Sequence, residues 1–273
     1  NYLYLCAHKK QRMNQKTLKN TYTFEGRGLH SGKMSHMKVC PAPVNTGIRF
    51  HRTDLGEDAF VDAIAENVSL TSRSTTISKG KVSVSTIEHL LSALTGLGVD
   101  NALIEVDNVE VPILDGSAEY YVKAIYPDGL EEQDAERKYI EIGSEFTYKD
   151  EKTGSYIKLI PDDHPSYEVT IDFNSRVLGV QTVKWDPSMD YVHEIQLLAS
   201  LGLIKGGDVE NAIVVVEKPV SEQKIAKLAK TFGHPELRVT EQGYLSNLKL
   251  HFPDECGRHK LLDIIGCRIQ AGT

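Results

Sequence analysis

The sequence is poor in cysteine and contains no long uninterrupted apolar run. Its four cysteines, Cys6, Cys40, Cys256 and Cys267, form no CxxC pair and are too sparse for a disulfide framework. This usage favours a reducing compartment, so we predict a cytoplasmic protein. No apolar stretch approaches the roughly 18 to 20 residues that span a bilayer, and the opening NYLYLCAHKKQR lacks the ordered regions of a signal peptide. We therefore predict no transmembrane segment.

An excess of positive charge is also missing. The 31 Lys and Arg residues are outnumbered by 38 Asp and Glu residues, which gives a net charge of -7 and a pI near 5.8. This balance argues against nucleic acid as a partner, although local basic clusters remain compatible with a phosphorylated small molecule. With 40% hydrophobic and 25% charged residues, the 273-residue chain has the composition of a globular protein with one or two cores.

The first half of the chain reads as strands followed by two helices. From Thr21, short β-type runs alternate with Gly, Pro and Asn/Asp turns, which indicates a meander of strands. A helix follows Ser85, because apolar residues recur there at i, i+3, i+4 and i+7, and it ends near Gly96. DNALIEV predicts a strand, and EVPILDGSAEYYVKAIY predicts a strand, a turn at Asp115-Gly116 and a second helix.

We expect two domains. Residues 1–12 precede Met13 and the first regular pattern, so we predict that they are a leader outside the domains. Residues 13–127 are predicted to form the first domain and residues 139–273 the second domain. The polar stretch 128–138 is predicted to be the linker between them. EIQLLASLGLIKGGDVENAIVVV echoes EHLLSALTGLGVDNALIEV at a spacing of 110 residues, from Asn101 to Asn211. This favours a duplicated unit over coincidence. The predicted class is α+β, with two similar domains.

The first chemical motif is STIEHLLSAL, in which Glu88 and His89 occupy the first turn of the predicted helix. Adjacent helical residues project about 100° apart, so these two side chains flank a common region. Ser85 and Glu88 also match a capping box, in which Glu88 would only bind the backbone N–H of Ser85. The motif by itself leaves both interpretations open.

The second motif is GRHKLLDIIG, in which His259 and Asp263 stand four residues apart and share one face of a helix. Their neighbours are mostly apolar, and an unpaired buried carboxylate or imidazole is costly. The two residues therefore either pair with each other or bind a metal ion. Together, the two motifs supply two imidazoles and a carboxylate with an additional glutamate, which is a ligand set typical of catalytic zinc.

Four segments carry a family resemblance: TFEGRGLHSG, STIEHLLSALTGLGVDNALIEVDNVEVPILDGS, LIKGGDVENAIVV and GRHKLLDIIG. In this order they resemble the UDP-3-O-acyl-N-acetylglucosamine deacetylases, zinc-dependent enzymes of lipid A biosynthesis, over about Thr21 to Gly266. The segment LIKGGD is most similar to the Bacteroidetes type of this family, which is often fused to a 3-hydroxyacyl-carrier-protein dehydratase. The resemblance implies two domains of helices on mostly antiparallel sheets, with the active site in the cleft between them.

The resemblance also implies roles for individual residues. His89, His259 and Asp263 match the ligands of one zinc ion per chain, and Glu88 matches the general base. Lys260 matches the lysine beside the metal, where its charge would stabilise the oxyanion or a substrate phosphate. His30, in the Gly-rich GRGLHSG loop, matches a substrate-binding position. Asp115 is expected to shape a turn at the edge of the site, not to act as a catalyst.

The end of the chain departs from the family pattern. Cys267 stands where the resemblance implies an aspartate, and no late Gly-His motif follows CRIQAGT. We therefore expect a truncated second domain and slow turnover with zinc binding retained. A non-catalytic remnant that binds zinc or a UDP-sugar is the alternative function, and a purely structural module in which the histidines form salt bridges is a third.

Overall fold

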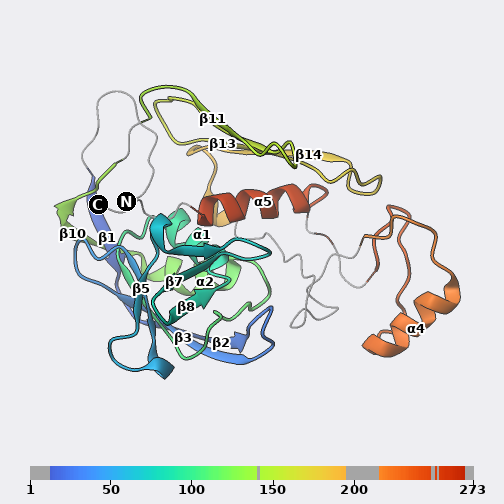
Figure 1. Ribbon diagram of the computed structural model, residues 1–273, viewed down its shortest axis with the longest axis horizontal. Helices are drawn as coiled ribbons and strands as arrows, with labels where there is room; N and C mark the ends of the chain where they lie inside the picture. The colour runs from blue at the N-terminus through green and yellow to red at the C-terminus, as the bar shows by residue number, and fades with distance from the viewer. Residues whose placement is uncertain (1–12, 140–141, 195–214, 247–249, 251, 268–273) are drawn as a thin grey trace.

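The computed structural model describes residues 13–139, 142–194, 215–246, 250 and 252–267. Its largest sheet has five strands, and only the neighbouring pair β4 and β9 is parallel (Figure 1). Every other pairing in this sheet is antiparallel. The strands lie in the order β2 (Tyr22–Arg27), β3 (Met34–Pro41), β9 (Ala102–Val106), β4 (Ile48–Arg52) and β5 (Phe60–Asp62).

A three-stranded antiparallel sheet leads into the first helix. It consists of β6 (Val68–Leu70), β7 (Thr76–Lys79) and β8 (Val82–Ser85), and α1 (Glu88–Leu97) follows directly. The buried apolar positions of α1 have the predicted helical spacing, and Gly98 ends the helix in a left-handed conformation with φ 85°. The prediction of this helix is confirmed. This part of the chain also contains α2 (Glu119–Ile125). Three short 3₁₀ turns lie at Thr53–Leu55, Ala65–Asn67 and Tyr126–Asp128.

Two predictions for residues 107–138 are wrong. The expected linker contains β10 (Leu130–Glu136), which pairs antiparallel with β1 (Asn14–Leu18) and so belongs to the first unit. Its polarity is that of an exposed strand in a two-stranded sheet, because such strands carry charged side chains. The expected strand at EVPIL is reduced to one bridge between Ser85 and Glu110.

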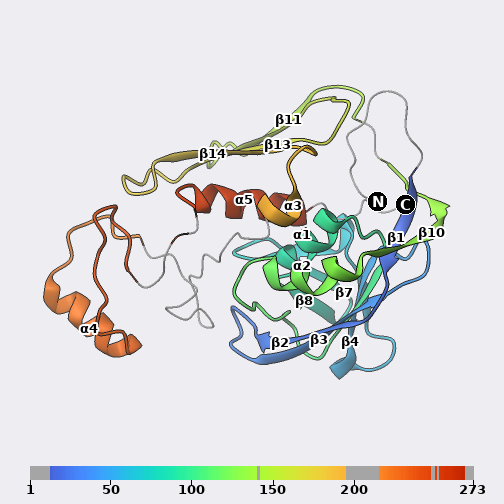
Figure 2. The same cartoon turned by 180° about the vertical axis from the view of Figure 1, so that it is seen from behind.

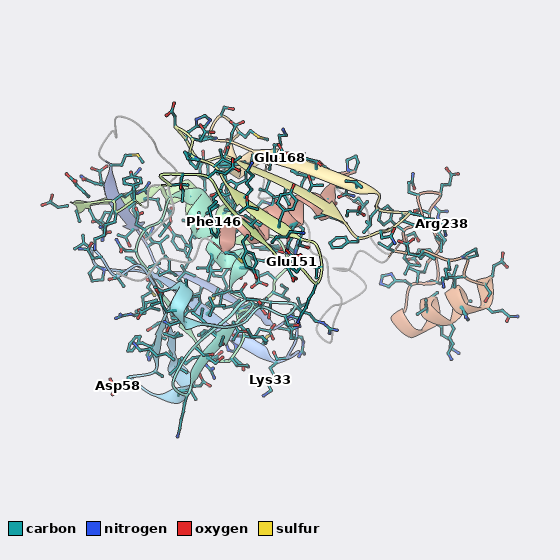
Figure 3. All side chains as sticks on the ribbon, turned by 45° about the horizontal axis from the view of Figure 1, so that its top comes forward. Lys33, Asp58, Phe146, Glu151, Glu168 and Arg238 are labelled. Atoms are coloured by element: carbon teal, nitrogen blue, oxygen red, sulfur yellow. The ribbon has the colours of Figure 1, made fainter. Side chains whose placement is uncertain are left out.

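The second half contains two antiparallel hairpins and several helices, of which α5 (Glu255–Gly266) is the longest described. The hairpins lie along one side of α5 in Figures 1 and 2, and Figure 3 labels Phe146 and Glu168 on them. The short helix α3 (Tyr191–Glu194) precedes α4 (Glu222–Phe232), which stands apart from the sheets. The hairpins and helix are β11 (Phe146–Lys149) with β12 (Tyr156–Leu159), β13 (Tyr167–Asp172) with β14 (Val180–Trp185), and α5 (Glu255–Gly266).

One apolar core joins the two halves. Leu261, Leu262 and Ile265 of α5 belong to the same buried cluster as the apolar face of α1 and the inward residues of β13 and β14. Helix α5 therefore packs between α1 and the β13–β14 hairpin. The α+β class is confirmed. The repeat of residues 195–214 and the leader 1–12 lie outside the described residues, so the duplication remains a prediction.

None of the helices within the described ranges is both long and apolar enough to cross a membrane.

Candidate metal centre

A close contact between α1 and α5 positions the candidate site. Gly266, the last residue of α5, lies directly against the first turns of α1. A Cβ at this position would overlap the carbonyl oxygen of Glu88 and would lie 2.9 Å from the Glu88 carbonyl carbon. Such an approach is possible only for glycine. It lets a side chain from α1 and two side chains from α5 face each other across the contact.

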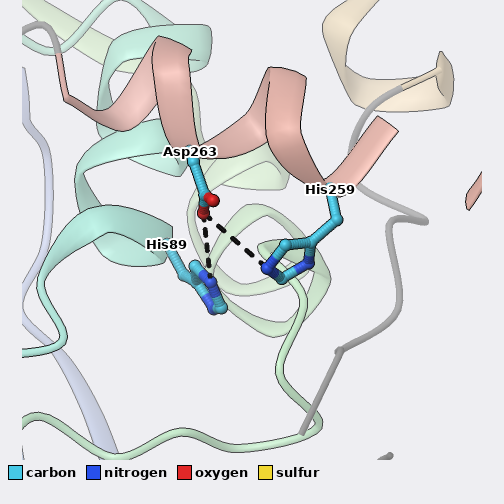
Figure 4. A group of neighbouring side chains, drawn as sticks. All are labelled: His89, His259 and Asp263. Carbon is cyan, nitrogen blue, oxygen red and sulfur yellow. Dashed lines mark ion pairs between the residues drawn. The ribbon is translucent and has the colours of Figure 1, made fainter. Parts of the chain in front are cut away.

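His89, His259 and Asp263 converge at this contact (Figure 4). Their potential ligand atoms all lie within 4.8 Å of one another. Each histidine Nε2 is 3.7 Å from Asp263 Oδ1, and the two rings meet edge to face with centroids 5.1 Å apart. The helical spacing of His259 and Asp263 thus places both on one face, as predicted, and the fold adds His89 from a segment 170 residues earlier.

The arrangement fits a metal ion better than a salt bridge. The 3.7 Å separations exceed hydrogen-bond length, so each histidine makes only a long ion-pair contact with Asp263 and no hydrogen bond. In addition, the Nδ1 atoms of His89 and His259 are buried without a partner among the described residues. The pKa of His89 is lowered to about 4, mainly by burial and also by the neighbouring His259, while Asp263 opposes the shift. A neutral imidazole is the form that binds metal, and the N₂O donor set suits zinc.

Glu88 is buried beside this group. Its Oε2 accepts a hydrogen bond of 3.0 Å from the backbone N–H of Thr75. The pKa of Glu88 is raised to about 7, mainly by burial; backbone hydrogen bonds oppose the shift and the negative charge of Asp263 adds to it. The capping-box interpretation is wrong, because the N–H of Ser85 donates to Val109 O and α1 has no side-chain cap. Glu88 is therefore a buried carboxylate held beside the metal group by the backbone of Thr75, thirteen residues earlier in the chain.

Lys260 and Cys267 lie at the edge of the group. Lys260 is exposed, and its Nζ is 3.6 Å from Asp263 Oδ2, so its charge borders the three converging residues. Cys267 follows the end of α5 and places its Sγ 3.5 Å from Thr75 Oγ1. The three-residue metal group found in the described part of the chain does not include this thiol.

His30 lies in the loop between β2 and β3, and its Nε2 is buried without a partner among the described residues. Its backbone N–H donates to the Glu110 carboxylate, which also accepts from the Thr86 hydroxyl just before α1. Asp115 forms the expected turn, since its Oδ1 accepts from the N–H and hydroxyl of Ser117.

Thr75 and Glu110 were not singled out by sequence reasoning. Thr75 binds Glu88 through its backbone N–H, a group that is common to nearly all residue types, so the sequence gives no indication of this contact. Glu110 carried one signal, because it is a carboxylate within the apolar run of VEVPIL. A charged residue in such a run is buried only where partners satisfy it.

Comparison with known proteins identifies the family of the chain. The family model for UDP-3-O-acyl N-acetylglycosamine deacetylase matches residues 15–232. The bifunctional enzyme LpxC/FabZ of Bacteroides thetaiotaomicron is 42% identical over 266 residues, which is 93% of this chain and 58% of that protein. The enzyme of the same name from Porphyromonas gingivalis is 42% identical over 92% of this chain and 57% of its own length.

A single-function relative is covered more fully. The UDP-3-O-acyl-N-acetylglucosamine deacetylase of Teredinibacter turnerae is 38% identical over 96% of this chain and 82% of that protein. The chain thus spans less than two thirds of the two bifunctional relatives and most of this one. His259 and Asp263 follow the range matched by the family model, so their place in the site rests on the geometry described above. On the family match and these identities, the chain belongs to the UDP-3-O-acyl N-acetylglycosamine deacetylase family.

Proposed function

We propose that this chain hydrolyses the N-acetyl group of UDP-3-O-acyl-N-acetylglucosamine, releases acetate and serves lipid A biosynthesis with one zinc ion per chain. The convergence of His89, His259 and Asp263 beside buried Glu88 is the observation that carries the proposal. The substrate class comes from the names of the relatives, which are 42% and 38% identical to this chain over the aligned residues. The cysteines Cys40, Cys256 and Cys267 are free thiols, which accords with the proposed cytoplasmic location.

His89, His259 and Asp263 would hold the zinc ion, which when bound supplies Lewis-acid chemistry for amide hydrolysis. Glu88 would take a proton from the attacking water at a carboxylate oxygen. The N–H of Thr75 orients that carboxylate, and burial keeps bulk water from competing for it.

Lys260 would act from the exposed edge of the site. Its ammonium group is close enough to Asp263 to lie beside the reacting amide, where it would stabilise negative charge on the oxyanion or a substrate phosphate. We assign His30 to substrate binding, since its buried Nε2 has no partner among the described residues. A fused or associated acyl-carrier-protein dehydratase is the proposed partner, because two relatives are bifunctional enzymes longer than this chain.

Two variants and one control test this function. His259→Ala should abolish stoichiometric zinc binding, and Glu88→Gln should keep zinc while lowering acetate release by about 10² to 10⁴-fold. His164→Ala is the matched control, because His164 is an exposed histidine near Asp162 and far from the metal group in sequence. Zinc content is measured by elemental analysis, and acetate is measured with UDP-3-O-acyl-N-acetylglucosamine. Unchanged zinc in His259→Ala, or unchanged acetate release in Glu88→Gln, would contradict the proposal.

A further inference from the structure

Glu110 is a buried carboxylate that the proposed reaction does not use. Its side chain is 1% exposed, and it accepts hydrogen bonds from three groups on two separate segments. The backbone N–H of His30 donates to Oε1 at 2.9 Å, and that of Ser31 donates to Oε2 at 2.8 Å. The Thr86 hydroxyl also donates to Oε1, at 2.7 Å. One carboxylate thus ties the loop between β2 and β3 to the residue just before α1.

The turn at Thr86 is strained. Thr86 is 1% exposed and has φ 60°, a left-handed conformation that β-branched residues rarely adopt. Such a residue persists only where surrounding contacts hold it, and the hydrogen bond to Glu110 is one of those contacts. Because Glu88 begins α1 two residues later, the direction of this turn sets where Glu88 and His89 project.

The loop is built around the same carboxylate. A Cβ at Gly28 would lie 2.8 Å from Glu110 Cδ and would overlap Oε2, so any larger residue would displace the carboxylate. The N–H of Gly28 donates to Lys33 O, and the N–H of Gly32 donates to Gly28 O, so the loop closes on itself. Burial by itself would raise the pKa of Glu110, but the donors from His30, Ser31 and Thr86 outweigh it and hold the pKa below its usual range.

We propose that Glu110 is a positioning residue of the active site, whose carboxylate holds the His30 loop against the strained turn from which α1 presents Glu88 and His89. This inference rests on the proposed deacetylase function. Glu110 touches neither the metal group nor the reacting atoms in this proposal. It acts through the backbone of residues 30 and 31 and through the Thr86 hydroxyl.

The test uses the full chain with Glu110→Gln, in which the amide presents a donor to groups that already donate. Glu110→Gln should speed hydrogen exchange at the His30 and Ser31 backbone amides and lower kcat/KM by about 10- to 100-fold. The variant should still bind zinc when zinc is supplied at a saturating concentration. Asp107→Asn is the matched control, because Asp107 also accepts a backbone N–H, that of His36, on an exposed turn. It should change neither measurement.

A second pair of variants covers the case in which Glu110→Gln does not fold. Thr86→Val keeps the side-chain shape and loses the hydroxyl, whereas Thr86→Ser keeps the hydroxyl. The proposal expects reduced kcat/KM in Thr86→Val and near-normal kcat/KM in Thr86→Ser. A purely structural role would lower the melting temperature of Thr86→Val and leave its kcat/KM equal to that of Thr86→Ser.

Unchanged amide exchange at His30 and Ser31, or unchanged kcat/KM in Glu110→Gln and Thr86→Val, would overturn the role of Glu110. Absence of acetate release from the unaltered chain is a different result, because it contradicts the proposed function. Amide exchange at His30 and Ser31 then decides whether Glu110 holds the loop: wild-type exchange in Glu110→Gln rejects this role, and faster exchange supports it.

Discussion

Substitution of Gly266 by alanine tests whether the contact between α1 and α5 builds the metal site. Within a helix, Gly→Ala alone stabilises by about 0.5 to 1 kcal/mol, because glycine loses more conformational freedom on folding. At Gly266 the opposite is expected. The added Cβ would lie 2.9 Å from the Glu88 carbonyl carbon and 3.1 Å from the Ser92 nitrogen, and it would overlap the Glu88 oxygen. All three are backbone atoms, so no side chain can rotate away.

The size of the displacement follows from ordinary contact distances. Non-bonded carbon atoms rest at about 3.5 to 4.0 Å, so α5 must move by about 1 Å from α1. Overpacking of this kind costs about 1 to 3 kcal/mol. Zinc sites tolerate deviations of only about 0.2 Å in ligand distance, so the same movement separates His89 from His259 and Asp263. We expect zinc affinity to fall by at least about tenfold, in the range seen when supporting contacts of metal sites are lost.

Zinc affinity is measured by competition with a chromophoric chelator, and stability is measured by thermal unfolding of the zinc-free chain. Ile264→Ala is the control, because Ile264 lies on the same helix and is 36% exposed, so its side chain can be shortened without overpacking. It should leave zinc affinity unchanged. Wild-type zinc affinity in Gly266→Ala, together with an unchanged or higher melting temperature, would refute the argument that this close contact assembles the site.

Three further predictions concern stability. Arg137→Ala removes the 2.8 Å contact between its Nε and Oδ2 of buried Asp100 and should cost about 3 to 5 kcal/mol in urea unfolding, whereas a loss below about 1 kcal/mol would contradict a stabilising role of this pair. Tyr191→Phe removes the 2.9 Å hydrogen bond between the Tyr191 hydroxyl and Ser92 Oγ and should lower the free energy of unfolding by about 1 kcal/mol. An unchanged free energy of unfolding would contradict this contribution. The pKa of Glu110 is lowered in the folded chain because its hydrogen-bond donors outweigh burial. The ionised Glu110 carboxylate therefore stabilises the fold fully above its unfolded pKa of about 4.3, and this stabilisation is lost as the pH falls through the lower folded pKa. The difference in unfolding free energy between the unaltered chain and Glu110→Gln should therefore shrink on acidification below about pH 4.3, and a difference that grows would reverse the sign.

Local patterns were sufficient for the elements that carry the metal group. The i, i+3, i+4, i+7 spacing identified α1, and Gly98 ends it because a left-handed residue closes a helix at little cost for glycine. The spacing of four residues placed His259 and Asp263 on one face of α5 because helical periodicity is a property of the backbone. These features depend on neighbours in sequence, so the sequence by itself determined them.

Long-range contacts decided the rest. Glu88 matched a capping box, yet the carboxylate binds Thr75, because the N–H of Ser85 is already taken by Val109 in the folded chain. The polar stretch after residue 128 matched a linker, yet it pairs with β1, because an exposed two-stranded sheet accepts charged side chains. Both patterns allow two local structures, and long-range contacts selected between them.

The meeting of His89 with His259 and Asp263 is also a product of tertiary structure. Nothing in the local sequence around Gly266 indicates that it lies against Glu88, since the two residues are far apart along the chain and become neighbours only when α1 and α5 share a core. The sequence alone determined which side chains were available as ligands. The tertiary structure decided that they form one group, because only the close approach at Gly266 brings the two helices near enough for their ligand atoms to lie within 4.8 Å of one another.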